Sequence, residues 1–217
     1  ASLLVLLVAC ASIGSPDGGR YDEEPPVVVS AQPGNKAIKV KSKKATINFN
    51  EYIKIDNPSE KVIVSPPQTE MPNIRAVGKS IRIDLFDSLQ ANTTYTVDFS
   101  DAIQDNNEGN PMGLFTYSFS TGETIDTMEV SGTVLNAEDL EPIKGILVGL
   151  YRQDSTFTDS TFRIKPLERI ARTNGSGQFS IKGIAPGEYR AFALKDMDGN
   201  YRFTQKSEQM AFDTVKF

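Results

Sequence analysis

The side chains that could do chemistry in this 217-residue chain are restricted by its composition. The sequence contains no histidine, no tryptophan and a single cysteine, Cys10. The absence of histidine removes the commonest general base, the usual Ser and Cys catalytic triads and most zinc sites. An enzyme would have to rely on paired carboxylates, as glycosidases do, and no acidic pair lies in a recognisable catalytic setting. We therefore predict a non-catalytic protein without a cofactor.

One acidic stretch near the end of the chain could offer oxygen ligands to calcium. Asp196, Asp198 and Asn200 alternate like the first ligands of an EF-hand loop. Tyr201 stands where that loop requires glycine, and Ser207 stands where it requires glutamate. We therefore favour a tight Asp-Gly-Asn hairpin over a metal site.

Asp101 and Asp105 belong to a second stretch rich in Asp, Asn and Glu, which ends at Asn110. Its oxygens could also bind calcium. Asx residues and glycine equally provide turn hydrogen bonds and positive φ without an ion. We interpret this stretch as a turn and assign no metal to the chain.

Cys10 follows an uninterrupted apolar run over residues 2–9. This run is far shorter than the roughly 20 residues of a spanning helix, and its length fits the end of a secretory signal. Leu7-Val8-Ala9-Cys10 resembles the lipobox of bacterial lipoproteins, in which the signal is cut before the cysteine and the cysteine is acylated. The resemblance implies that residues 1–9 are a signal-peptide remnant. It also implies that Cys10 is a lipid anchor, with about 0.8 kcal/mol gained per buried methylene.

Residues 10–24 would join this anchor to the first folded segment. After the cysteine they carry Gly, Ser, Pro and acidic residues without an apolar period, which is typical of a flexible linker. The acidic residues resemble the signal that routes Bacteroidota-type lipoproteins to the cell surface. We therefore expect a lipid-anchored outer-membrane protein on the cell surface, and a periplasm-facing anchor is the alternative.

Residues 151–167 are our first candidate for a contact surface. This polar stretch contains Tyr151, Phe157 and Phe162, and loops on a rigid sandwich often carry binding. Tyr201 is a further aromatic candidate. Two of the three rings in the stretch could equally belong to a strand core.

Alternation with a period of two predicts short antiparallel strands over residues 25–122. The apolar members of these runs are Ala45-Ile47-Phe49, Ile81-Ile83-Leu85, Tyr95-Val97-Phe99 and Phe115-Tyr117-Phe119. The strand at Asn92-Thr-Thr-Tyr95 and the later Gly109-Asn110-Pro111 loop resemble the bacterial Ig-like domain first described in S-layer proteins. The resemblance implies an Ig-like β-sandwich, a fold that serves as a spacer or as a binding module.

A second alternating segment, residues 127–217, follows a short polar linker. Asn174-Gly175 and Pro186-Gly187 are its turn signals. Together with Gly132-Thr-Val134, Gly177-Gln-Phe179 and Tyr189, they resemble the carboxypeptidase-regulatory, transthyretin-like β-sandwich, which is related to the B-type repeats of collagen-binding adhesins. The resemblance implies a second domain without a catalytic centre. Because the last alternating run reaches Phe217, we expect this domain to continue further.

These features predict an all-β protein with two tandem antiparallel β-sandwiches after a lipidated linker. The net charge of -5 argues against nucleic-acid binding. We expect an envelope lipoprotein that is held at the membrane through Cys10 and presents sandwich loops to an unidentified protein or other envelope partner. Glycan capture beside a nutrient-uptake system is the alternative, although the chain lacks tryptophan, the strongest stacking platform for sugars.

Overall fold

The computed structural model describes residues 22–217, so Cys10 and the expected signal remnant lie outside the described residues. Strands and two four-residue helices, α1 (Pro58–Lys61) and α2 (Thr161–Ile164), make up its regular structure. The all-β prediction is confirmed. Among residues 22–217, no helix has the length and apolar character needed to cross a bilayer.

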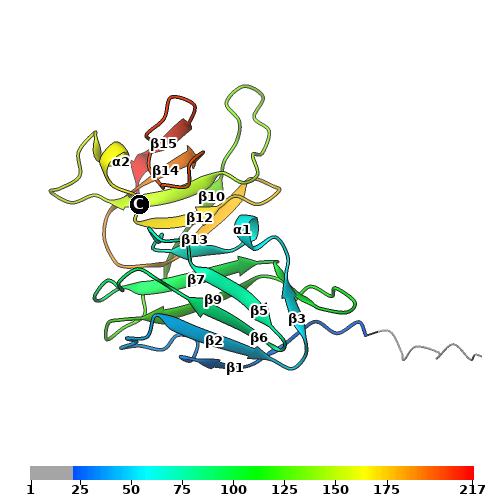
Figure 1. Cartoon of the computed structure of the whole chain (residues 1–217). Helices are drawn as coiled ribbons and strands as arrows, with labels where there is room; N and C mark the ends of the chain where they lie inside the picture. Colours follow the sequence, from blue (N-terminus) through cyan, green and yellow to red (C-terminus); the bar gives the residue numbers. More distant parts are fainter. Residues whose placement is uncertain (1–21) are drawn as a thin grey trace, which may run out of the picture.

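The first unit is a sandwich of antiparallel sheets (Figure 1). One sheet has the order β1 (Val28–Gln32), β2 (Lys44–Phe49), β6 (Ser80–Asp84), β5 (Asn73–Val77). The other has the order β4 (Ile63–Ser65), β7 (Thr94–Ser100), β9 (Phe115–Ser120). A two-stranded pair, β3 (Ile53–Ile55) with β8 (Ile103–Asp105), completes the unit.

The core of the first unit consists of the side chains that alternation assigned to one face of each strand. Ile47 on β2 and Ile81 and Ile83 on β6 are fully buried, and they face Tyr95 and Phe119 from the other sheet. The rings of Tyr95 and Phe119 stack with centroids 5.2 Å apart. Burial of such side chains contributes about 1.5–3 kcal/mol each, which accounts for a stable sandwich without disulfides.

The second unit consists of a two-stranded sheet, β10 (Met128–Thr133) with β13 (Gln178–Ile184), packed against a four-stranded sheet. The latter has the order β12 (Arg169–Arg172), β11 (Leu147–Arg152), β14 (Tyr189–Lys195), β15 (Gln209–Lys216). All pairings are antiparallel. Every named strand pairing joins partners on the same side of residues 121–127, which connect the two units.

The central strand β11 is buried on both faces. Val148 and Leu150 face the two-stranded sheet. Leu147 and Tyr151 face the opposite side, where they join a second hydrophobic cluster. Gly149 permits this packing, because a Cβ at that position would lie 2.7 Å from Leu167 Cδ1. The four-stranded sheet therefore has no solvent-exposed face at β11, unlike the half-buried sheet that simple alternation describes.

Candidate functional site: loops and the domain junction

Tyr151 is a core residue. Its side chain is only 1% exposed, and its hydroxyl donates a hydrogen bond of 2.7 Å to the Lys165 carbonyl. Its ring meets Phe192 of β14 edge-on, with centroids 5.4 Å apart. Tyr151 therefore belongs to a strand core, which was the alternative for this stretch, and its ring is not exposed on a contact loop.

The other three aromatic candidates surround the same cluster. Phe157, Phe162 and Tyr201 are partly buried and pack against it, and the rings of Phe157 and Phe162 lie 6.5 and 6.2 Å from Phe192. We call this hydrophobic cluster, together with the rings that pack against it, the outer aromatic cluster. Its buried members are Leu147, Tyr151, Leu167, Ile170, Phe192 and Leu194. Residues 151–167 thus cover the outer face of the four-stranded sheet. A binding role for this stretch stays a prediction.

The loop between β14 and β15 brings together three acidic side chains. One carboxylate oxygen from each of Asp196, Asp198 and Glu208 lies within 4.8 Å of the others. The sequence reading found the first two and missed Glu208, which is 4% exposed and follows Ser207 by one position. The sequence signal for Glu208 was an acidic residue one position after Ser207, which occupies the last ligand position of the EF-hand spacing. The predicted tight hairpin is wrong, because residues 196–208 all belong to the connection.

These carboxylates organise the loop through its own donors. Asp196 accepts the N–H groups of Gly199 and Tyr201, and Glu208 accepts three further N–H groups, from Met197, Thr204 and Gln205. Tyr201 has φ +61°, the left-handed conformation for which an EF-hand loop uses glycine. Every carboxylate oxygen of this cluster accepts at least one hydrogen bond, including both oxygens of Asp198. The arrangement by itself explains an ordered turn, and we assign no metal.

Asp101 and Asp105 have separate structural roles. Asp105 is buried and accepts backbone N–H groups from Asn107, Glu108 and Gly109 at 2.7–3.1 Å. Asp101 is exposed and pairs with Lys61 of α1 at 3.0 Å. The turn interpretation of this stretch agrees with these contacts.

Acid is expected to destabilise the loop at Asp105. The hydrogen bond from the Asn107 N–H is the main cause that holds the pKa of Asp105 below its ordinary value of 3.8, against the opposing effect of burial. A depressed folded-state pKa means that the ionised carboxylate stabilises the fold above the unfolded-state pKa. This stabilisation is lost as pH falls through the folded-state pKa. Urea unfolding between pH 6 and about pH 2.5 should show this loss.

The Asp105→Asn variant is the matched control for that measurement. Its amide nitrogen would face N–H donors and cannot titrate, so the variant should be less stable at pH 6. Its stability should also change less between pH 6 and acid than that of the unchanged protein. Parallel pH profiles for the two proteins would contradict the role assigned to Asp105.

The two units meet at a buried polar junction, where β4 and β7 of the first contact β12 and β13 of the second (Figure 1). Arg169, at the start of β12, is 8% exposed. Its Nη1 donates to the carbonyl oxygens of Thr94 and Ser65 in the first unit. The N–H of Ile170 donates to Ser65 Oγ at 3.1 Å. The side chain of Arg169 and the backbone N–H of Ile170 thus both donate hydrogen bonds to the first unit.

Close packing accompanies these hydrogen bonds. Gly183 of β13 has φ +69°, and a Cβ there would lie 2.9 Å from Thr96 Cγ2 and 3.1 Å from Thr94 Cγ2. Asp126, in the connection, accepts a hydrogen bond of 2.8 Å from Thr94 Oγ1 and donates its N–H to the same oxygen at 2.9 Å. The connection is therefore tied down at the junction.

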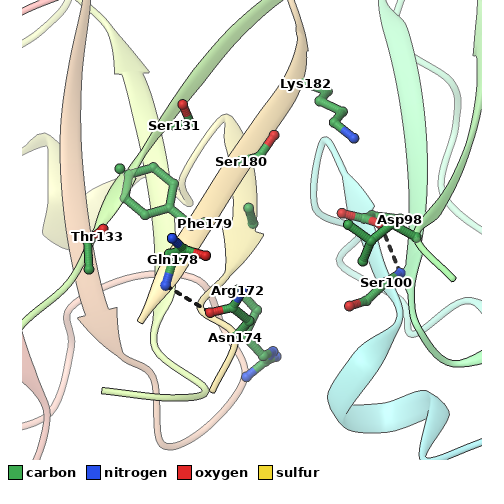
Figure 2. A pocket seen from close by; sticks show the side chains of 13 residues that line it. Asp98, Ser100, Ser131, Thr133, Arg172, Asn174, Gln178, Phe179, Ser180 and Lys182 are labelled. Atoms are coloured by element: carbon green, nitrogen blue, oxygen red, sulfur yellow. Dashed lines mark hydrogen bonds between the residues drawn. The ribbon is translucent and has the colours of Figure 1, made fainter. Parts of the chain in front are cut away.

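A groove of about 450 Å³ opens between the units (Figure 2). Figure 2 shows Ser180 and Lys182 of β13 on one side and Asp98 and Ser100 of β7 on the other. Asp98 accepts hydrogen bonds from the Ser100 N–H at 2.9 Å and from Thr116 Oγ1 at 3.4 Å. The groove is lined mainly by hydroxyl, amide and charged side chains. Both units contribute to it, so its shape depends on their relative orientation.

Residues 22–121 match the family model of a bacterial Ig-like domain. The first unit is therefore an Ig-like β-sandwich, and the chain combines it with a second all-β unit. No curated protein matches the chain.

Solved structures give distant similarities. The N-terminal part of the bacterial S-layer protein SbsC is 15% identical, with 86% of this chain and 43% of that chain covered and a TM-score of 0.30. An L,D-transpeptidase from Mycobacterium smegmatis is 14% identical, covering 69% and 77% with a TM-score of 0.29. BcpA, the major pilin subunit of Bacillus cereus, is 8% identical, covering 87% and 66% with a TM-score of 0.24. This chain spans less than half of that S-layer chain, and the scores are too low to transfer a function.

Proposed function

We propose that this protein is a non-catalytic structural and interaction module of the bacterial outer membrane, anchored at the cell surface by lipids on Cys10. The buried junction between the two β-sandwiches carries the structural part of the proposal, and the resemblance of Leu7-Val8-Ala9-Cys10 to a lipobox supports the anchor. Domains in one chain move relative to each other unless their interface restrains them. Here Arg169, Ile170 and Gly183 restrain them through hydrogen bonds and close packing.

A restrained pair of sandwiches acts as a rigid spacer. The lipid would hold residues 10–24 at the membrane, the Ig-like unit would follow, and the second unit would present its loops at a fixed orientation. A rigid arrangement loses less conformational entropy on binding than a flexible one does. Surfaces made by both units, such as the groove of Figure 2, are then preformed.

We also propose that the second unit is a transthyretin-like, carboxypeptidase-regulatory sandwich. Three of its motif residues occupy structural positions that support the assignment. Phe179 packs beside Gly132 across the β10–β13 pair. Tyr189 is buried after the Pro186-Gly187 turn, and its hydroxyl donates to the Ala185 carbonyl at 2.9 Å. These are residues that stabilise the fold and not residues of a reactive centre.

The contacts of the acidic side chains support a non-catalytic role. Asp105, Asp196 and Glu208 accept backbone N–H groups in their own loops. Asp98 in the groove accepts hydrogen bonds from its neighbours Ser100 and Thr116. Carboxylates held in this way stabilise loops and strands.

The anchor is tested by expressing the complete gene in a bacterial host beside a Cys10→Ala variant. Mass spectrometry should find an acylated peptide beginning at Cys10, and only the variant should be released from membranes. Proteinase added to intact cells should degrade the unchanged protein. Acylation with full protection would place the protein on the periplasmic side, and an unmodified soluble protein would overturn the anchor.

Glycan capture has less support from this structure. It requires exposed aromatic platforms, and the four aromatic candidates named from the sequence do not supply one: the ring of Tyr151 is buried, and Phe157, Phe162 and Tyr201 pack against the outer aromatic cluster. A glycan-array signal would be needed to restore this alternative.

A further inference from the structure

A second opening at the junction carries an excess of positive charge. Its volume is about 370 Å³, and both units line it. We call it the basic cleft, after Arg152, Lys165 and Arg169, which line it together with Asp126 and Glu168. With the three basic and two acidic side chains ionised, these residues have a net charge of +1.

Arg169 brings a buried cation to this cleft. Only its Nη1 has a hydrogen-bond partner among residues 22–217, since Nε and Nη2 donate to none of them. None of the described carboxylates lies within the 4.0 Å of Nη1, Nη2 or Nε that defines an ion pair. A buried charge is costly unless an opposite charge or hydrogen bonds compensate it. The guanidinium therefore has donors and a charge available to a ligand.

Arg152 and Lys165 extend the positive surface. Both are exposed, and neither forms an ion pair with the described part of the chain. Arg152 Nη2 donates to the Pro186 carbonyl at 2.9 Å, which holds the guanidinium in place. Lys165 Nζ donates to Thr156 Oγ1 at 3.2 Å. Both cations are thus positioned by neutral oxygens.

The acidic residues of the cleft do not cancel this charge by direct contact. Asp126 accepts from Thr94 Oγ1, and Glu168 accepts from the Arg152 N–H at 3.3 Å. Burial raises the pKa of Tyr189 in the cleft wall; the charges of Arg152 and Arg169 oppose that rise, whereas Glu168 and Asp126 add to it. All four charges are thus close enough to act on one hydroxyl group.

An apolar wall lies beside the charges. Pro66 and Pro67 contribute from the first unit, and Pro166 and Leu167 from the second. Such a wall suits the methylene stem of a side chain and excludes water from one side of an ion pair. Ion pairs are stronger where water is partly excluded.

We propose that the basic cleft binds a carboxylate group of a protein partner, presented on an acidic peptide segment. A guanidinium offers a planar pair of donors that matches a carboxylate. A single negative charge neutralises the net charge of the cleft, whereas a phosphate dianion exceeds that charge and is repelled about twice as strongly by Asp126 and Glu168. This inference rests on the proposed function, because it names the partner class of the same interaction module.

The test is a titration of the full chain carrying Cys10→Ala, which removes the lipid and keeps both units. The probes are sodium acetate, inorganic phosphate, and two acetylated peptides that differ only in one Glu or Gln. Sodium chloride keeps the ionic strength constant. The NMR signal of the Arg169 Nε–H should shift and saturate with acetate and with the Glu peptide, and the Gln peptide should bind about tenfold more weakly.

Variants assign the effect to the cleft. Arg152→Gln with Lys165→Gln should weaken Glu-peptide binding by about tenfold, and Glu168→Gln should strengthen it by about threefold. The control is Lys144→Gln, an exposed lysine outside the cleft, which should leave binding unchanged. These variants leave the Arg169 contacts in place, so a folding defect does not obscure the result.

Three results would overturn the proposal: no saturable shift at Arg169, equal affinity for the Glu and Gln peptides, or binding unaffected by the double variant. Tighter binding of phosphate than of acetate would overturn the carboxylate assignment in favour of a phosphate group. None of these results depends on acylation of Cys10. The proposal of a lipid anchor and the proposal of a carboxylate-binding cleft can therefore be rejected independently of each other.

Discussion

The Arg169→Met variant is expected to lose about 2–4 kcal/mol of unfolding free energy, because a buried charge leaves the junction and two carbonyl groups lose its hydrogen bonds, one of them keeping a bond of 3.4 Å from Thr96 Oγ1. The carbonyls are those of Thr94 and Ser65 in the first unit, so the loss falls on the junction. The two sandwiches should then unfold in separate transitions. Urea unfolding followed by circular dichroism measures the first effect, and small-angle X-ray scattering should show a wider distribution of overall dimensions.

Arg172→Met is the matched control, three positions along β12. Arg172 is exposed and donates to the Gly145 carbonyl within its own unit at 3.3 Å. Its removal should change stability by about 0.5 kcal/mol or less. Equal losses for the two variants, or unchanged scattering for Arg169→Met, would contradict a junction held by Arg169.

Gly183→Ala tests the same junction without changing charge. The new methyl group would approach Thr96 and Thr94, and such overpacking costs about 1–3 kcal/mol. The control is Gly199→Ala, which has a similar positive φ of +73° but open space around the added Cβ. Alanine at either position costs about 1–2 kcal/mol, because both positions have a positive φ. The difference in unfolding free energy between the two variants therefore reports the contact between the units.

Tyr151→Ala is expected to destabilise the second unit by about 3–5 kcal/mol, as for other buried aromatic side chains truncated to alanine. The ring is central to the outer aromatic cluster and touches both Phe157 and Phe192. Tyr151→Phe should cost only about 1 kcal/mol, since it removes the hydrogen bond to the Lys165 carbonyl and keeps the packing. Chemical denaturation measures both values.

Tyr52→Ala is a suitable control, because the Tyr52 side chain is 60% exposed and its removal should cost about 0.5 kcal/mol or less. If Tyr151→Ala kept full stability and abolished binding of a partner, the ring would be a contact residue as the sequence reading expected. A loss of binding that accompanies a loss of stability would reflect unfolding of the sheet.

Strands with one buried face were accessible to sequence reasoning. Ile47, Ile83, Val97 and Tyr117 alternate with polar residues, and the structure buries all four. Alternation succeeds there because one face of each strand meets the other sheet, whereas the opposite face carries polar residues, which meet water or, at Thr94 and Thr96 of β7, the second unit. The candidate sites were harder to predict from the sequence. Glu208 and Arg169 have their roles through contacts with Asp196 and Asp198 and with the first unit, and spacing along the sequence does not encode these contacts.

The sequence by itself determined the all-β class, the main strands of the first core, and the lack of imidazole chemistry. Only the tertiary structure decided that Tyr151 is buried, that Glu208 joins Asp196 and Asp198, and that Arg169 binds the first unit. The physical reason is distance along the chain. Strand periodicity is a local property, whereas the covering of a second sheet face and the burial of a charge at a junction depend on segments that meet only after the sandwiches have folded.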